Sequence, residues 1–353
     1  MNSQDVSKTI YPCDRDRPYA FISYSRKDKA EVIGAVKELQ QKGYNIWIDT
    51  ELRKNDQDWR TQVKEVIKDL DCKLVLFFMS RDSLISSACL YELQCTRDED
   101  VRKKHGNKNV SYTVVELEKI GSEKRFLEEL KESYEFNGSI PKAKKEAAVD
   151  AITGMEDFVS TRIENFGTEE CVSEIEKELS ENRIEKFTVE EMYAKGIAWL
   201  SNELTYPQAL DVIDLCANNK KYEYFPAILM SLFIYDTEQY GRKNPEELEK
   251  MSFYASIQLD ESQWRETAQR YKDNRQYEEA LAFYLAYATT KQSGRDYIEA
   301  LKTWNEMNKP SFWGTKICAK KAMDLGNQTG KKLYSYYEKM SESEFFSILK
   351  NRK

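Results

Sequence analysis

The chain divides into two regions by the spacing of its apolar residues. In the first half, short apolar runs alternate with stretches in which apolar residues recur every three or four positions. From about residue 185 only the second spacing remains. Short apolar runs are typical of strands buried on both faces, and the three-to-four spacing is typical of amphipathic helices. We therefore predict an α/β region followed by an all-helical region.

The first region is predicted to contain alternating strands and helices. The apolar runs of strand length lie at 19–23, 44–49, 73–80 and 109–117. One helix face is marked by Val32, Val36 and Leu39 before Gly43, and a second by Trp59, Val63, Val66, Ile67 and Leu70. A loop with several possible helix caps is expected at 80–87, and a third helix over 88–100. This alternation predicts a doubly wound parallel sheet.

Ligands of such sheets bind at the carboxyl ends of the strands. That rule selects the loops at 23–28, 49–58 and 80–88. Glu92 lies in the opening turns of the helix after the third loop, so its carboxylate can face the same cleft. The alternative is an ordinary surface residue, because charged side chains are mostly exposed.

Composition and charge exclude several other functions. The 353 residues are enough for two domains, and the net charge of −7 argues against nucleic acid as a partner. No apolar run is long enough to span a membrane, and the first residues have no apolar signal-peptide core. Seven cysteines without a C-x-x-C pair fit a reducing cytoplasm and argue against thiolate zinc. His105 is the one histidine, so we expect neither a metal site nor a His-based triad.

Four segments in order resemble a bacterial-type TIR (Toll/interleukin-1 receptor) domain. They are YAFISYSRKDK, GYNIWIDTEL, QDWRTQVKEVIKDLDCKLVLFFMS and SLISSACLYEL. The resemblance implies a flavodoxin-like doubly wound parallel sheet over 17–180, after an extension at 1–16. It is clear for about 17–120, and a fifth strand and last helix are expected between 121 and 180.

The resemblance also implies an activity, since many bacterial TIR domains cleave NAD+, here a substrate and not a cofactor. Glu92 stands at the family's catalytic glutamate in the Trp-x-x-x-Glu element, while Ala88 replaces the tryptophan. Tyr91, Trp59 or Trp47 could supply aromatic surface instead. One carboxylate is adequate, because nicotinamide leaves as a neutral molecule without a general acid, and a glutamate can stabilise the developing positive charge. The product is then ADP-ribose or a cyclic isomer.

The remaining candidates for substrate binding each have a structural alternative. Ser23, Tyr24, Ser25 and Arg26 could hold phosphate or ribose, or could cap a helix and be solvated. Asp49 could contact ribose or could be a turn residue. Trp59 could contact the substrate or could pack in the core. Cys89 has no activating neighbour in sequence and is expected to pack.

The helical region repeats itself. Tyr-x-x-Ala-Leu occurs at 206–210, 277–281 and 297–301, with a related YFPAI at 224–228. The first and second copies begin 71 residues apart, close to two helix–turn–helix repeats of roughly 35 residues. The segment resembles tetratricopeptide-like (Sel-type) repeats, predicted over 181–353 with a capping helix pair at 311–353. Such a domain would receive a protein or ligand trigger that the sequence does not identify.

Two functions from different classes fit these observations. The first is an NAD+ glycohydrolase or cyclase acting through Glu92, activated by self-association through the BB loop at 49–58, in bacterial antiphage defence. The alternative is a non-catalytic adaptor working through TIR–TIR and repeat-domain contacts, which Ala88 favours. Only the enzyme would consume NAD+ in a Glu92-dependent manner.

Overall fold

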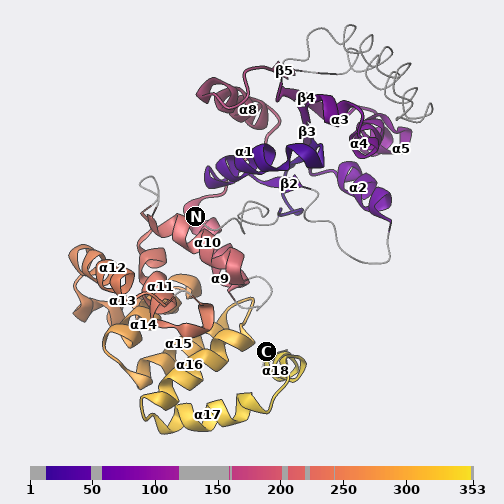
Figure 1. Cartoon of the computed structure of the whole chain (residues 1–353). Helices are drawn as coiled ribbons and strands as arrows, with labels where there is room; N and C mark the ends of the chain where they lie inside the picture. Colours follow the sequence, from indigo (N-terminus) through magenta and orange to yellow (C-terminus); the bar gives the residue numbers. More distant parts are fainter. Residues whose placement is uncertain are drawn as a thin grey trace, which may run out of the picture. The chain divides into compact units, whose positions relative to one another are not determined.

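The protein forms two compact units, Met1–Phe187 and Thr188–Lys353 (Figure 1). A computed structural model describes residues 13–48, 58–118, 159, 161–200, 206–218, 223–241 and 243–350. The first unit is α/β and the second is helical throughout its described residues, which confirms the predicted fold class.

A five-stranded parallel sheet forms the centre of the first unit. Its strands are β1 (Tyr19–Tyr24), β2 (Ile46–Ile48), β3 (Cys72–Met79), β4 (Ser111–Glu116) and β5 (Thr161–Ile163), in the order β2-β1-β3-β4-β5. The order reverses direction between β1 and β3, which are adjacent. In a doubly wound sheet, this is the position at which the loops diverge and leave a crevice for a ligand.

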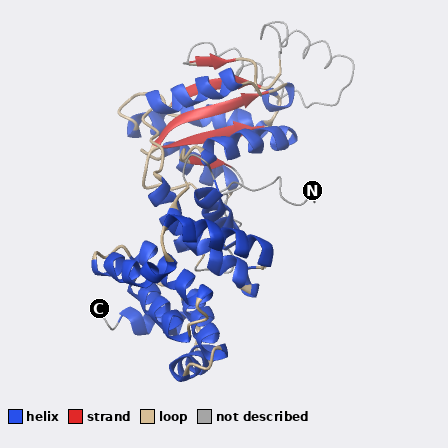
Figure 2. Cartoon of the chain, turned by 90° about the vertical axis from the view of Figure 1, so that its left-hand side faces the viewer, coloured by secondary structure: helices blue, strands red, loops and turns tan. Residues whose placement is uncertain are grey.

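Helices cover both faces of the sheet (Figure 2). The bounds are α1 (Lys29–Gln41) and α8 (Glu169–Glu181) on one face, and α2 (Trp59–Lys68), α4 (Ser87–Arg97) and α5 (Glu99–Lys104) on the other. Side chains alternate along a strand. In β1, Ala20 and Ile22 therefore pack toward α1, while Tyr19 and Phe21 pack toward α2 and α4. The same alternation directs Ser23 toward the α4 face.

The local structure departs from the predictions at three places. Leu70 was expected in the apolar stripe of α2, but the helix ends at Lys68 and Leu70 is 49% exposed. The segment at 80–87, predicted as a loop, contains the short helix α3 (Arg81–Leu84), which has a capping box between Ser80 and Ser83. The single helix predicted over 88–100 is divided at Asp98 into α4 and α5.

Gly43 ends α1 as the sequence predicts. Its φ is +94°, in the left-handed region that favours glycine. A Cβ at this position would lie 2.8 Å from the carbonyl oxygen of Phe187. The residue is therefore required both by the turn and by the close approach of a second backbone segment.

The helical unit is a series of helices in which neighbours in sequence mostly pack together. Their bounds are α9 (Val189–Trp199), α10 (Tyr206–Asn218), α11 (Phe225–Asp236), η3 (Glu238–Tyr240), α12 (Pro245–Gln258), α13 (Glu261–Asp273), α14 (Tyr277–Thr290), α15 (Gly294–Glu306), α16 (Phe312–Asp324), α17 (Gln328–Glu338) and α18 (Glu342–Lys350). The alanines of the repeated motif, Ala209, Ala280 and Ala300, are fully buried, as close helix packing requires. The predicted capping pair at 311–353 is instead the three helices α16, α17 and α18.

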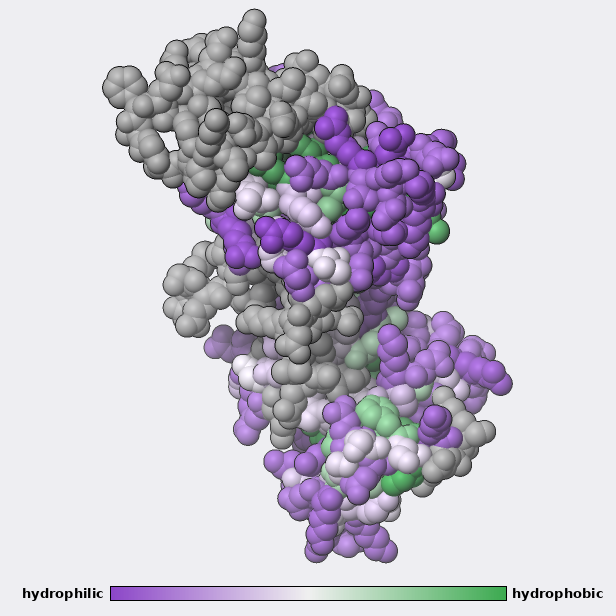
Figure 3. Space-filling model, turned by 90° about the vertical axis from the view of Figure 1, so that its right-hand side faces the viewer, coloured by the Kyte–Doolittle hydropathy of each residue, from purple (hydrophilic) through white to green (hydrophobic). Residues whose placement is uncertain are grey.

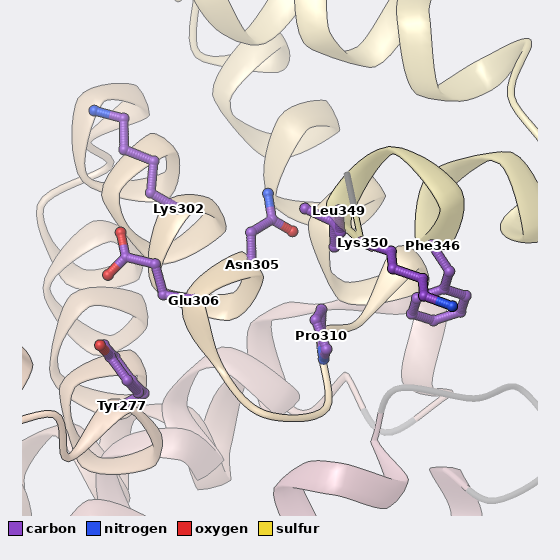
Figure 4. A pocket seen from close by; sticks show the side chains of 8 residues that line it. All are labelled: Tyr277, Lys302, Asn305, Glu306, Pro310, Phe346, Leu349 and Lys350. Carbon is purple, nitrogen blue, oxygen red and sulfur yellow. The ribbon is translucent and has the colours of Figure 1, made fainter. Parts of the chain in front are cut away.

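The helical unit has a cavity of about 670 Å³ of its own (Figure 4). Its lining comes from the start of α14, the end of α15 with the turn after it, and α18. The residues are Tyr277, Lys302, Asn305, Glu306, Pro310, Phe346, Leu349 and Lys350. Lys302 pairs with Glu299 at 2.8 Å and Glu306 with Lys272 at 3.1 Å, so the charges of α15 at this cavity are already compensated.

The visible surface of each unit in Figure 3 is mostly hydrophilic, with smaller apolar areas among the polar residues. Within the described ranges, no helix has the length and apolar character needed to cross a lipid bilayer.

Candidate active site

A cavity of about 350 Å³ lies at the carboxyl ends of β1 and β3, where the strand order predicts a ligand site. Its walls come from β1 and the turn after it, the first residue of α2, and the start of α4. The lining residues are Ile22, Tyr24, Ser25, Arg26, Lys27, Trp59, Ser86, Ala88 and Glu92. The volume is within the range of about 300–1,000 Å³ common for small-molecule sites.

Glu92 is positioned in this cavity by the start of α4. Ser86 is the N-cap of that helix, and its hydroxyl accepts a hydrogen bond from the backbone N–H of Cys89 at 3.4 Å. Glu92 follows in the second turn and is only 6% exposed. The interpretation of Glu92 as an ordinary surface residue is therefore wrong. A carboxylate held this far from solvent needs polar partners, because burial of an unpaired charge is costly.

Ser23 supplies one of those partners. Its hydroxyl donates to Glu92 Oε2 at 2.6 Å, joining residues that are 69 positions apart in the chain. Ser23 is 1% exposed and is not part of the cavity lining. The structure thus brings Ser23 to the candidate carboxylate, and not to the surface that a ligand would touch.

The other predicted binding residues after β1 line the cavity. Tyr24, Ser25 and Arg26 all contribute to its wall. The Ser25 hydroxyl also accepts from the backbone N–H of Lys27 at 3.3 Å and so caps the short helix η1 (Arg26–Asp28). The predicted helix-capping role is therefore observed at Ser25, while its contact with phosphate or ribose stays a prediction. Asp49 lies outside the described residues.

Aromatic surface in the cavity comes from Tyr24 and Trp59. The Trp59 side chain is half-buried and makes an edge-to-face contact with Tyr91, with ring centroids 5.5 Å apart. The Arg60 guanidinium lies 4.8 Å from the Trp59 ring centroid. Trp47 is buried and stacks on Phe21 at 4.7 Å, so it belongs to the core. Ala88, which the resemblance aligns with a tryptophan, contributes only a methyl group to the lining.

Charged groups connect the loops that border the cavity. Lys27 lines it and pairs with Asp82 of α3, and Asp28 accepts a hydrogen bond from the Ser80 hydroxyl at 2.5 Å. Both contacts join the turn after β1 to the segment after β3. Sequence reasoning missed Lys27 and these contacts. The signal available was the occurrence of SRKD and SRDS directly after two strands whose ends meet.

A second layer of buried groups lies beneath Glu92. Burial, with the nearby charge of Glu92, raises the pKa of the Cys89 thiol to about 12. Burial also raises the pKa of Tyr112, with smaller contributions from Cys89 and Glu92. Cys89 is therefore a protonated thiol at neutral pH and unsuited to act as a nucleophile, which agrees with its predicted packing role.

The arrangement combines one carboxylate, two cationic side chains and two aromatic rings around a space large enough for part of a nucleotide. Within the described ranges, no three histidine, cysteine, aspartate or glutamate side chains are grouped so that they could hold a metal ion. Such a site can bind an anionic, ring-bearing molecule and place a negative charge beside a centre that becomes positive.

Comparison with known proteins identifies the family of the segment that contains this cavity. Residues 20–150 match the family model described as the TIR domain. No curated protein matches the chain. The matched residues include β1 from Ala20 onward, α2, β3 and α4, and every side chain that lines the cavity.

Proposed function

We propose, from the TIR domain that residues 20–150 form, that this chain cleaves NAD+ to nicotinamide and an ADP-ribosyl product with Glu92 as the catalytic carboxylate. The TIR family includes NAD+ hydrolases and non-catalytic adaptors. The observation that carries the proposal is the burial of Glu92 in a cavity at the carboxyl ends of the central strands. A surface used only for protein contacts has no need of a carboxylate withdrawn from solvent.

One carboxylate is sufficient for this reaction because of the leaving group. The bond between ribose C1′ and the pyridinium nitrogen breaks, and its electron pair neutralises that nitrogen, so nicotinamide departs without protonation. The ribose is left with oxocarbenium character, which the Glu92 carboxylate stabilises electrostatically. Ordinary glycosides require a second carboxyl group to protonate the leaving oxygen.

The attacking group determines the product. When water adds to C1′, a new C–O bond forms, one proton is released, and the product is ADP-ribose. When a nucleophile of the same molecule adds, the product is a cyclic isomer. The Glu92 carboxylate can orient the attacking group and accept its proton.

The other lining residues provide the binding surface. Arg26 and Lys27 bring positive charge to the turn after β1, where they would pair with the pyrophosphate of NAD+. The Trp59 ring offers a face or edge for the nicotinamide ring in place of the aromatic group missing at Ala88. Asp49, which lies outside the described residues, is proposed as a ribose contact.

Control of the activity is proposed to reside outside the cavity. TIR domains self-associate in general, and we propose that the loop at 49–58 joins one TIR domain to the next and activates catalysis. The helical unit would receive the trigger. Depletion of NAD+, or the release of a nucleotide signal, would then serve bacterial antiphage defence.

The experiment that tests the proposal is incubation of the purified full chain with NAD+ at several protein concentrations, with separation of the products by chromatography. Glu92→Gln preserves the shape of the side chain and removes its charge, so nicotinamide release should fall by about 100-fold or more. Glu99→Gln is the matched control, because Glu99 lies on the next helix and its side chain is 80% exposed. It should leave the rate unchanged.

The adaptor function is the second candidate, and the small side chain of Ala88 in the cavity favours it. If the wild-type chain releases no nicotinamide even when concentrated or crowded, or if Glu92→Gln is as active as the wild type, the enzymatic proposal fails. The chain would then be expected to act through TIR–TIR and repeat-domain contacts.

A further inference from the structure

The hydrogen bond between Ser23 and Glu92 has a geometry that suits an ionised acceptor. The distance from Ser23 Oγ to Glu92 Oε2 is 2.6 Å, within the range of about 2.5–2.7 Å expected when a hydroxyl donates to a carboxylate. Both side chains are buried, which limits competition from water for the contact. A hydrogen bond of this kind fixes the rotation of the carboxylate and favours its charged form.

Ser23 cannot serve as the ligand contact that its place in the sequence suggested. Tyr24 on one side and Ile22 on the other line the cavity, whereas Ser23 points to the α4 face and is 1% exposed. Glu92 stands between Ser23 and the space that a ligand would fill. Any influence of Ser23 on a bound molecule must therefore pass through Glu92.

Cys89 is a neutral neighbour of this pair, because burial raises the pKa of its thiol to about 12 and keeps it protonated. Ser23 has a single hydroxyl proton, and that proton is directed at Glu92 Oε2. A protonated thiol does not compete with the Glu92 carboxylate as an anionic acceptor for this proton.

We propose that Ser23 is the positioning residue for Glu92: its hydroxyl holds the carboxylate in the orientation and the ionised form that the reaction uses. The role in catalysis rests on the proposed NAD+ cleavage. The coupling between the side chains of Ser23 and Glu92 does not depend on that activity, and it can be measured separately.

The kinetic test compares the full chain with its Ser23→Ala variant. Loss of a hydrogen bond to a charged group should lower kcat by about 10- to 100-fold, while KM changes less than about threefold. Ser23→Thr keeps a hydroxyl on the same strand and should recover most of the rate. A rise in KM with kcat unchanged would show a ligand contact instead, and would overturn the proposal.

A double-mutant cycle checks that Ser23 acts through Glu92. In the Glu92→Gln background the charge that Ser23 positions is gone, so Ser23→Ala should cause little additional loss of rate. Additive losses would mean that the two residues act separately, and this result would also overturn the proposal.

The activity-independent test is a pH titration of the Glu92 carboxyl carbon by NMR in ¹³C-glutamate-labelled protein, with Glu92→Gln used to assign the signal. The titration midpoint should move to higher pH in Ser23→Ala, because the charged form loses a hydrogen bond. Other titratable groups face Glu92, and all of them are unchanged in this variant: Cys89, Cys95, Tyr112, Tyr24, Arg26 and Lys27.

Thr96→Val is the matched control for the titration. Thr96 is a buried hydroxyl on the same helix that donates to the Leu93 carbonyl at 2.8 Å and does not line the cavity. It should leave the Glu92 midpoint in place. If the wild-type chain does not cleave NAD+ but the Glu92 midpoint still moves in Ser23→Ala, the enzymatic function is refuted and the coupling between Ser23 and Glu92 is supported. An unmoved midpoint refutes the Ser23 proposal, whatever the activity.

Discussion

At the scale of single residues, the candidate site depends on the difference between a buried and an exposed carboxylate. Glu92 and Glu99 lie seven positions apart on successive helices, yet one is 6% exposed and the other carries a largely exposed side chain. Burial makes the charge of Glu92 effective at short range, because the surrounding dielectric is low. The same burial makes the residue depend on the hydroxyl of Ser23.

Trp59 is the residue for which the structure makes the clearest prediction about substrate affinity. Trp59→Ala removes one of the two aromatic side chains that line the cavity, so KM for NAD+ should rise by about tenfold, while kcat falls less. Steady-state kinetics of nicotinamide release measures both constants.

Trp47→Phe is the comparison for that prediction. Trp47 is buried against Phe21, so this change should lower the unfolding free energy and leave KM unchanged. Equal KM values for Trp59→Ala and the wild type would exclude Trp59 as a substrate contact.

At the scale of elements, α4 is held in place at both ends. Ser86 caps its start. At its end, Asp98 is shared with α5, where its carboxylate accepts from the backbone N–H of Asp100 at 2.9 Å. The second carboxylate oxygen of Asp98 pairs with Lys64 of α2 at 2.7 Å. The apolar spacing did not predict the helix break at Asp98. At this break, the ion pair between Asp98 and Lys64 links the end of α4 to α2.

This junction should make the stability of the first unit depend on pH. The hydrogen bond from Lys64 lowers the pKa of Asp98 below its ordinary value. A carboxyl group with a lowered pKa contributes stability above its unfolded value of about 4, and that contribution is lost as the pH falls through the folded value. Asp98→Asn keeps a good helix cap and removes the charge.

Urea unfolding of Asp98→Asn and the wild type at pH 7 and about pH 3 measures this contribution. At pH 7 the variant should be less stable by a few tenths to about 1 kcal/mol, because the ion pair is about one-third exposed. At pH 3 the difference should shrink. A constant difference across this range would show that the charge of Asp98 contributes nothing.

At the scale of the whole molecule, the two compact units should unfold as separate transitions. Gly314 of α16 tests this, since a Cβ there would lie 2.5 Å from the ring of the fully buried Trp304. Gly314→Ala should destabilise the helical unit by about 1–3 kcal/mol through overpacking. Amide hydrogen exchange with mass spectrometry, which reports each unit separately, should show faster exchange in the helical unit alone.

Gly34→Ala is the matched glycine substitution in the first unit. Gly34 is within α1, and apart from the adjacent backbone of this helix no atom lies within 4 Å of a Cβ at this position. Replacement of a helix glycine by alanine should stabilise the first unit by up to about 1 kcal/mol. If either variant changed amide exchange equally in both units, the prediction that the two units unfold separately would be contradicted.

The sequence by itself determined the elements whose apolar spacing is regular. The run at 19–23 became β1, the stripe of Val32, Val36 and Leu39 became the buried face of α1, and Gly43 ended that helix. Apolar spacing records which side of each element is buried, and strands that alternate with helices have few other arrangements than a parallel sheet. The position of Glu92 after the third strand was also available from the chain.

The tertiary structure alone decided which side chains meet. Strand order places the ends of β1 and β3 together, and only then does Ser23 reach Glu92 across 69 residues of sequence. It also separated Trp59, which lines the cavity, from Trp47, which packs in the core. Distances between elements depend on strand order, register and the side chains of both partners. A local pattern of apolar and polar residues contains none of these quantities.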